Sequence, residues 1–202
     1  CISSAASDVY KRQFRNPLVE PYTLGISGGA SVAVTTAIVF SLPALYGSFM
    51  LPVAGFIGAL VTIFLVYTLG IKRGKIRIQT LLLTGVMISF ISSSLMLLIM
   101  SVTKSENLHG IVFWIMGSLN ETDPVLITLI SVVSLVVLGI TFLYTPILNA
   151  MRLGSERAIQ LGVNAGQAIR VLFLLSSLLT GMCVSIVGVI GFVGLIIPQL
   201  MR

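Results

Sequence analysis

Long apolar stretches separated by short polar connections dominate the pattern of this 202-residue chain. Five runs stand out, at about 25–46, 49–69, 78–102, 124–145 and 168–190. A helix rises about 1.5 Å per residue, so about 20 apolar residues are needed to cross a hydrocarbon core about 30 Å thick. The pattern therefore predicts an all-α, polytopic membrane helical bundle with about five full spans.

The connections between these runs differ in charge, and the difference predicts an orientation. Seven basic residues lie in the second and fourth connections, 70–77 and about 146–170: Lys72, Arg73, Lys75, Arg77, Arg152, Arg157 and Arg170. The third connection, 103–123, holds a single basic residue, Lys104, and lies on the opposite side because successive spans alternate in direction. Cytoplasmic loops are enriched in Lys and Arg. We therefore expect 70–77 and 146–170 inside and 103–123 outside.

Composition narrows the range of functions. Charged residues make up 9% of the chain and the mean hydropathy is +1.10, whereas about a quarter of the residues in a soluble domain are charged. The net charge of +6 does not indicate nucleic-acid binding, because the basic residues sit in short loops and not on one water-facing surface. Cys1 and Cys183 are far apart and His109 is the single histidine. We therefore predict no disulfide framework, metal site or cofactor site.

The interiors of the predicted spans contain no Asp, Glu, Lys, Arg or His. Ionisable groups inside a membrane usually mark proton relays and ion paths. Their absence argues against a proton-coupled pump and indicates that energy is supplied from elsewhere. The sequence also has no G-x-x-x-x-G-K-[ST] phosphate-binding loop. We therefore predict that the chain is not an enzyme and does not itself bind ATP in the usual way.

Several helix ends carry signals of their own. Asp123 followed by Pro124 suits an N-cap and a first helical position, since proline has no N–H to lose there. Asn164 followed by Gln167 resembles a capping box that opens the last span. Ser155 can cap a short helix that Gly162 ends. We therefore expect the loop at about 146–167 to be structured.

The two ends of the chain differ from the rest. Residues 1–13, CISSAASDVYKRQ, are polar and resemble translated adapter sequence. We set them aside as a non-native segment and treat 14–202 as a partial transmembrane domain. The chain stops at Arg202 just after a Gly-rich apolar segment, so we expect a fragment that is open at both ends.

Three stretches, in order along the chain, carry a resemblance to a known family. They are NPLVEPYTLGISGGA at 16–30, IVFWIMGSL at 111–119, and LGSERAIQLGV at 153–163 followed by GVIGFVGLIIP at 188–198. Together they resemble the permease subunits of ABC importers for iron siderophores, haem and vitamin B12, the FecCD type of type II importer. Gln199 stands where that family usually has histidine.

The resemblance implies a fold, a function and partners. The fold is the membrane bundle of the vitamin B12 importer permease, in the bacterial cytoplasmic membrane. The function is the passage of a ferric siderophore or a related iron, haem or cobalamin chelate. The partners are a cytoplasmic ATP-binding subunit that hydrolyses ATP, a second permease subunit (identical or different), an extracytoplasmic substrate-binding protein and membrane lipid, with no nucleic acid.

The resemblance also implies three sets of site residues. The cytoplasmic loop would dock on the ATPase through Leu153, Gly154, Ser155, Glu156, Ala158, Leu161, Gly162 and Val163. The span 78–102 would line the pathway through Ser89, Ser92, Ser93 and Ser94, although hydrogen bonds between helices explain such serines equally well. The external motif comprises Phe113, Trp114, Gly117 and Ser118. It can face the binding protein, but we favour an interfacial anchor for its aromatic pair.

Two other functions stay open as alternatives. A secondary transporter would use Gly-rich helix ends as substrate sites, but the spans offer no carboxylate for ion coupling. An intramembrane serine protease would use Ser27, in Gly25-Ile26-Ser27-Gly28, as its nucleophile. Its base would have to be His109, which charge and parity place at the opposite side of the membrane.

Overall fold

The computed structural model describes residues 25–47, 49–72, 75–76, 78–118, 123–152 and 164–189. Most of these residues are helical, which confirms the expected all-α class. A two-residue antiparallel pair, β1 (Ile71–Lys72) with β2 (Lys75–Ile76), sets Ile71 opposite Ile76. The helices are α2 (Ile26–Val39), α3 (Leu42–Tyr46), α4 (Met50–Gly70), α5 (Ile78–Val102), α6 (Ser105–Met116), α7 (Pro124–Leu143), α8 (Thr145–Arg152) and α10 (Ala165–Val187).

Within the described residues, α4, α5, α7 and α10 are long and apolar enough to cross a membrane. The first predicted span, 25–46, is not one helix and corrects our expectation of about five full spans. It is divided into α2, with 14 residues, and α3, with 5. Proline has no N–H, and its ring clashes with the carbonyl four residues earlier. For Pro43 that carbonyl belongs to Val39, where α2 ends, and Ser41 turns the chain at φ 54°.

The third connection contains a helix that hydropathy did not reveal. Residues 105–116 form α6 within the segment 103–123, for which we expected only a loop. Ile111 is buried and Trp114 is half-buried, whereas Phe113 and Met116 are exposed. Residues three apart share a helix face, so one face of α6 packs on the bundle and another is open. Such a helix is too short and too mixed in polarity to stand out as an apolar run.

The predicted caps are present at two helix starts. The side chain of Asp123 accepts a hydrogen bond of 2.9 Å from the Val125 N–H, with Pro124 in the first turn of α7. The side chain of Asn164 accepts one of 3.1 Å from the Gln167 N–H at the start of α10. Both caps satisfy amides that have no partner inside the helix.

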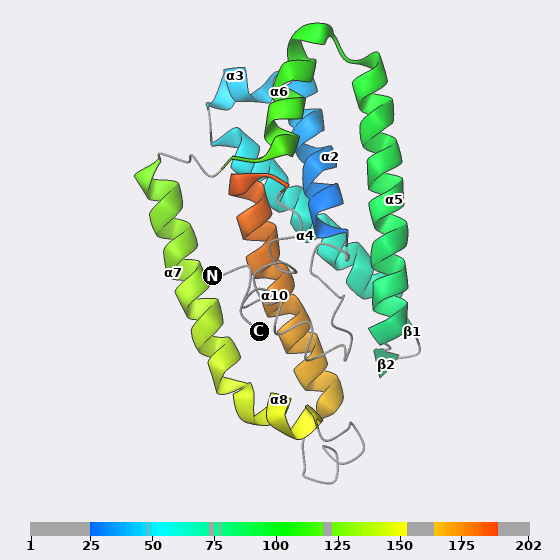
Figure 1. The fold of residues 1–202 in the computed structure, drawn as a ribbon, viewed down its shortest axis with the longest axis vertical. Coiled ribbons are helices and arrows are strands. Elements are labelled where there is room, and N and C mark those ends of the chain that lie inside the picture. Colours follow the sequence, from blue (N-terminus) through cyan, green and yellow to red (C-terminus); the bar gives the residue numbers. More distant parts are fainter. Residues whose placement is uncertain are drawn as a thin grey trace, which may run out of the picture.

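The helices form a bundle in which the two kinds of connection lie at opposite ends (Figure 1). The β1–β2 pair and α8, which belong to the basic connections, lie at the lower end of the view. The helices α3 and α6 lie at the upper end. This arrangement matches the separation of basic and non-basic connections that parity predicts.

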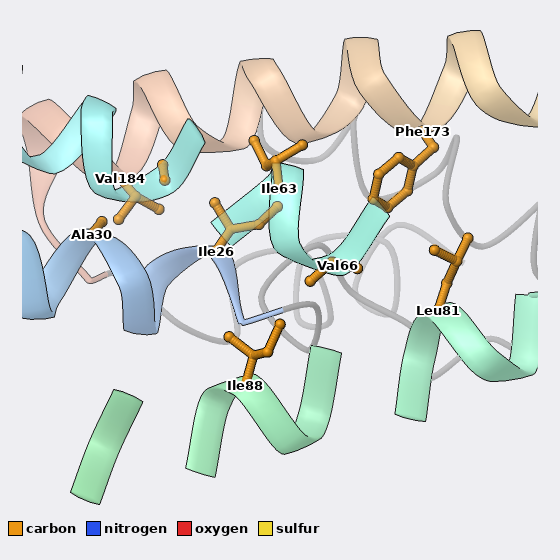
Figure 2. Close-up of a cluster of buried hydrophobic side chains, with 9 residues drawn as sticks. Ile26, Ala30, Ile63, Val66, Leu81, Ile88, Phe173 and Val184 are labelled. Carbon is orange, nitrogen blue, oxygen red and sulfur yellow. The ribbon is translucent and has the colours of Figure 1, made fainter. Parts of the chain in front are cut away.

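The core lies where α2, α4, α5 and α10 meet. Figure 2 shows side chains from all four helices pointing into one layer. Phe173 of α10 lies in this layer together with Val66 of α4 and Leu81 of α5. The buried members of this cluster are Ile26, Ala30, Ala59, Ile63, Val66, Leu81, Ile88, Phe173 and Val184. Lipid tails are as apolar as these side chains, so close packing and dispersion hold the helices together in a membrane.

Close packing is tightest where α2 crosses α4. A Cβ atom added at Gly29 would overlap Thr62 Oγ1 and lie 2.9 Å from the Gly58 carbonyl oxygen. A Cβ atom added at Gly58 would overlap the Gly29 carbonyl oxygen. The Thr62 hydroxyl donates to the same Gly58 carbonyl at 2.9 Å, so it is satisfied within its own helix. The two backbones are therefore in direct contact, and neither glycine leaves room for a side chain.

Candidate functional site

The four external-motif residues bring α6 into contact with two other parts of the bundle. Trp114 packs against the core cluster of α2, α4, α5 and α10, and against a second cluster formed by Val34, Ala37 and Ala54. Its neighbour Phe113 is 69% exposed. The two aromatic side chains therefore differ in their surroundings: Trp114 packs α6 onto the bundle, and Phe113 faces outward.

Gly117 and Ser118 join the end of α6 to the end of α10. Gly117 ends α6 at φ 70°, and Gly188 ends α10 at φ 82°. Both values lie in the region that favours glycine. The Ser118 N–H donates a hydrogen bond of 2.8 Å to the Val187 carbonyl. A Cβ atom at Gly188 would overlap the Trp114 carbonyl oxygen and lie 2.8 Å from Gly117 Cα.

The four serines predicted to line a pathway fall into two groups. Ser92 is 8% exposed, and a Cβ atom added at Gly28 of α2 would lie 3.0 Å from Ser92 Cβ. Ser89 lies against Gly25 in the same way, and its hydroxyl donates to the Gly85 carbonyl at 3.1 Å. Ser89 and Ser92 therefore pack between α5 and α2.

Ser93 and Ser94 point away from that contact and are exposed among the described residues. Large apolar side chains such as Phe90 and Leu97 share the open side of α5. Only this second pair of serines lies on a surface that a passing molecule could contact.

All eight residues predicted to dock on an ATPase, from Leu153 to Val163, lie outside the described residues. The structure describes their flanks, which are α8, ending at Arg152, and the cap of α10 at Asn164. Residues 146–152 of the predicted cytoplasmic loop are therefore helical. The helix α10 begins at Ala165, three residues before residue 168, where we predicted the last span to begin.

The geometry gives no support to a serine protease. Ser27 is buried at the start of α2. Gly110, the neighbour of His109, approaches Ile38 near the other end of α2. Ile38 stands eleven residues beyond Ser27, a rise of about 16 Å along a helix. Within the part of the chain that the structure describes, no three His, Cys, Asp or Glu side chains are grouped to hold a metal ion.

The sequence of this chain matches a known family of transport proteins. The sequence profile of the FecCD transport family matches residues 4–202. The chain belongs to the FecCD transport family. The match begins inside the segment 1–13 that we set aside, and the structure describes none of those residues.

Three curated FecCD-like relatives illustrate the similarity. The hemin transport system permease protein HmuU of Yersinia pestis is 35% identical over 204 residues, covering 100% of this chain and 61% of its own length. The vitamin B12 import system permease protein BtuC of Yersinia pseudotuberculosis is 35% identical, with 96% and 57% covered. The cobalamin import system permease protein BtuC of Halobacterium salinarum is 33% identical, with 94% and 50% covered. The chain thus spans about half to three-fifths of the length of these relatives.

A solved structure shares the fold. A metal-chelate type ABC transporter in an inward-facing conformation superposes with a TM-score of 0.89 at 30% identity, covering all of this chain and 63% of its own. The bundle is therefore that of a FecCD-type permease, a multi-pass membrane fold.

One feature of the site escaped sequence reasoning. The motif residues Gly117 and Gly188 were both visible, but nothing in the sequence showed that they meet. They stand 71 residues apart, and a glycine that ends a helix gives no sign of its partner.

Proposed function

We propose that this chain forms part of the permease subunit of an ATP-driven importer for ferric siderophores or related haem or cobalamin chelates. The observation that carries the proposal is the family match over residues 4–202, together with relatives that are named as hemin and vitamin B12 permeases. The fold of a metal-chelate type ABC transporter adds to it. The proposed location is the bacterial cytoplasmic membrane.

The proposed assembly contains three further kinds of protein. A cytoplasmic ATP-binding subunit hydrolyses ATP, a second permease subunit completes the pathway, and an extracytoplasmic binding protein delivers the chelate. The chemistry of the spans supports an external energy source. Among the described spans, the single Asp, Glu, Lys, Arg or His is Arg170, in the second turn of α10. A proton- or ion-coupled carrier normally needs ionisable groups deeper in the membrane.

The arrangement of the connections supports a position for the ATPase at the end of the bundle that carries the basic connections. The β1–β2 pair and α8 share one end of the bundle, and Lys and Arg favour the cytoplasm. We therefore place the loop 153–163 at the cytoplasmic end, where Ala158 and Leu161 would contact the ATPase. The external motif lies at the opposite end, where the binding protein would dock.

The test is reconstitution of the full-length permease with its ATPase and binding protein in vesicles. Uptake of a ferric siderophore, haemin and cobalamin is measured in parallel, with ATP or with a non-hydrolysable analogue. The proposal predicts ATP-dependent uptake of at least one of these chelates. Uptake driven equally well by a proton or sodium gradient without ATP would contradict it.

Ala158→Arg tests the coupling loop in the same vesicles. A charge buried in a packed contact without a partner is strongly destabilising, so this variant should hydrolyse ATP without uptake while inserting normally. Glu156→Ala should act more weakly, because a charge at the rim or in a first helical turn contributes about 1 kcal/mol or less. Coupled transport by the Ala158→Arg protein would remove the docking role.

A further inference from the structure

The backbones at the ends of α6 and α10 are in direct contact. The Ser118 N–H bonds the Val187 carbonyl at 2.8 Å, and Gly188 lies against Gly117 and the Trp114 carbonyl with no room for a Cβ atom. A contact between side chains can absorb a displacement by changing rotamers. A contact between two glycine backbones cannot, because no flexible group lies between them.

The two partners of this contact are themselves rigid. The helix α10 runs without a break from Ala165 to Val187, about 34 Å at 1.5 Å per residue, and contains no proline. The first residues of α10 follow the loop 153–163, and its last residue, Val187, accepts the hydrogen bond from Ser118 just beyond the end of α6 (Figure 1). In the other partner, α6, Ile111 is buried and Trp114 packs on both core clusters, so this end of α6 is firmly packed.

We propose that the contact of Gly117 and Ser118 with Val187 and Gly188 is a mechanical joint that carries a displacement of α10 to the external helix α6. The proposal rests on the proposed function, because the displacement begins at the loop that meets the ATPase. The joint adds a specific route to that function: movement at the cytoplasmic end of α10 changes the position of α6 on the opposite side of the membrane. Gly117 and Gly188 are positioning residues in this scheme and contact no substrate.

Two variants break the joint in different ways. Gly188→Ala places a methyl group where the Trp114 carbonyl stands and strains a residue at φ 82°. Ser118→Pro removes the N–H that bonds Val187 and adds no bulk at Gly188. Ser118 is not among the described residues with a positive φ, a conformation that proline could not adopt. If Gly188→Ala does not fold, Ser118→Pro still tests the joint.

A matched control leaves the joint intact. Gly110→Ala makes the same substitution in α6 itself, where the nearest described atom to the new Cβ is Ile38 Cγ2 at 3.8 Å. This control should behave like the wild-type protein. Ser118→Ala keeps the backbone N–H that bonds Val187 and is the reference for Ser118→Pro, since the two variants lose the same hydroxyl.

The experiment uses the full-length permease–ATPase complex with its binding protein in vesicles. Hydrogen–deuterium exchange is compared with and without ATP for peptides covering 164–175 and 105–118, beside uptake and ATP hydrolysis. In the wild type, both peptides should respond to ATP. In Gly188→Ala and Ser118→Pro, the response at 164–175 should persist and the response at 105–118 should disappear. Uptake should fall by about tenfold or more, a typical size for a lost coupling between sites.

Three results separate the joint from the proposed function. A wild type that imports chelate and responds at 164–175 but not at 105–118 overturns the joint alone. A Gly188→Ala protein with a normal response at 105–118 also overturns the joint. A wild type with neither ATP-dependent uptake nor a response at 164–175 contradicts the proposed function and, with it, the joint that depends on it.

Discussion

The helices α7 and α10 differ in hydropathy and in burial, and the two differences run in opposite directions. The mean hydropathy of α7 is 2.7, the highest of the four long helices. Yet only 11% of its most apolar 18-residue stretch is buried. The mean hydropathy of α10 is 2.0, the lowest of the four, and 50% of its most apolar 18-residue stretch is buried. In a soluble protein the more apolar helix would be expected inside. Among the described residues of this chain, the most apolar helix is among the most exposed.

The difference lies in the size and polarity of the side chains at the contacts. The buried face of α10 includes Ser176, Ser177, Gly181 and Ser185, which let another backbone come close. The Ser185 hydroxyl donates to the Met182 carbonyl at 2.8 Å, and Ser176 bonds carbonyls of its own helix. These hydroxyls are satisfied without water. The side chains of α7 are instead large and apolar, and most of them are exposed within the described part of the chain.

The largest expected effect comes from filling the closest crossing. Gly58→Leu would drive a side chain into the Gly29 backbone, and overpacking of this kind costs about 3 kcal/mol or more. We expect the full-length protein to lose its folded state in detergent, as followed by circular dichroism. Gly139→Leu in α7 is the matched control, since no described atom lies within 4 Å of its Cβ position. Equal losses in both variants would contradict the contrast between the two regions.

Removing an aromatic ring should have the next largest effect. Phe173 in α10 is 1% exposed and Phe142 in α7 is 77% exposed. Phe173→Ala leaves a cavity and should lower the free energy of unfolding by about 3 kcal/mol. Phe142→Ala should lower it by well under about 1 kcal/mol, because most of this ring has no packing partner in the described part of the chain. Unfolding of each variant in mixed micelles measures the two values, and a larger loss in Phe142→Ala would reverse our assignment of inner and outer helices.

Raising the hydropathy of each helix separates the two regions further. Ser185→Leu makes α10 more apolar, but Ser185 is 3% exposed and lies against Gly55. This change should cost about 2 kcal/mol through overpacking. Ser131→Leu makes α7 more apolar at an exposed position and should be neutral within about 0.5 kcal/mol. Stabilisation by Ser185→Leu would show that hydropathy, and not fit, governs the interior.

The smallest expected effect concerns the start of α7. Asp123→Ala removes the acceptor of the Val125 N–H and should cost about 1 kcal/mol. The loss should be local, because Val125 in the first turn of α7 is exposed and the buried cluster of α7 lies further along, at Val137. Hydrogen exchange of residues 123–128 should therefore rise while exchange of α10 stays unchanged. Asp123→Asn keeps an acceptor and should restore most of the protection.

The sequence by itself determined the features that depend on neighbours along the chain. Long apolar runs gave α4, α5, α7 and α10, and the caps at Asp123 and Asn164 lie where their side-chain chemistry predicted. The division of the first span at Pro43 was also a local effect, which hydropathy averaging concealed. The family resemblance came from motifs readable in one dimension, and the family match bears it out.

Only the tertiary structure decided which faces of these helices meet. It set Ser89 and Ser92 against α2, left Ser93 and Ser94 outside, and joined Gly117 to Gly188. The helix α6 likewise takes its place from contacts with α2 and α4. In lipid, an apolar residue is acceptable on either side of a helix, so polarity does not mark the inner face. Shape does, and the fit between two surfaces depends on residues far apart in the sequence.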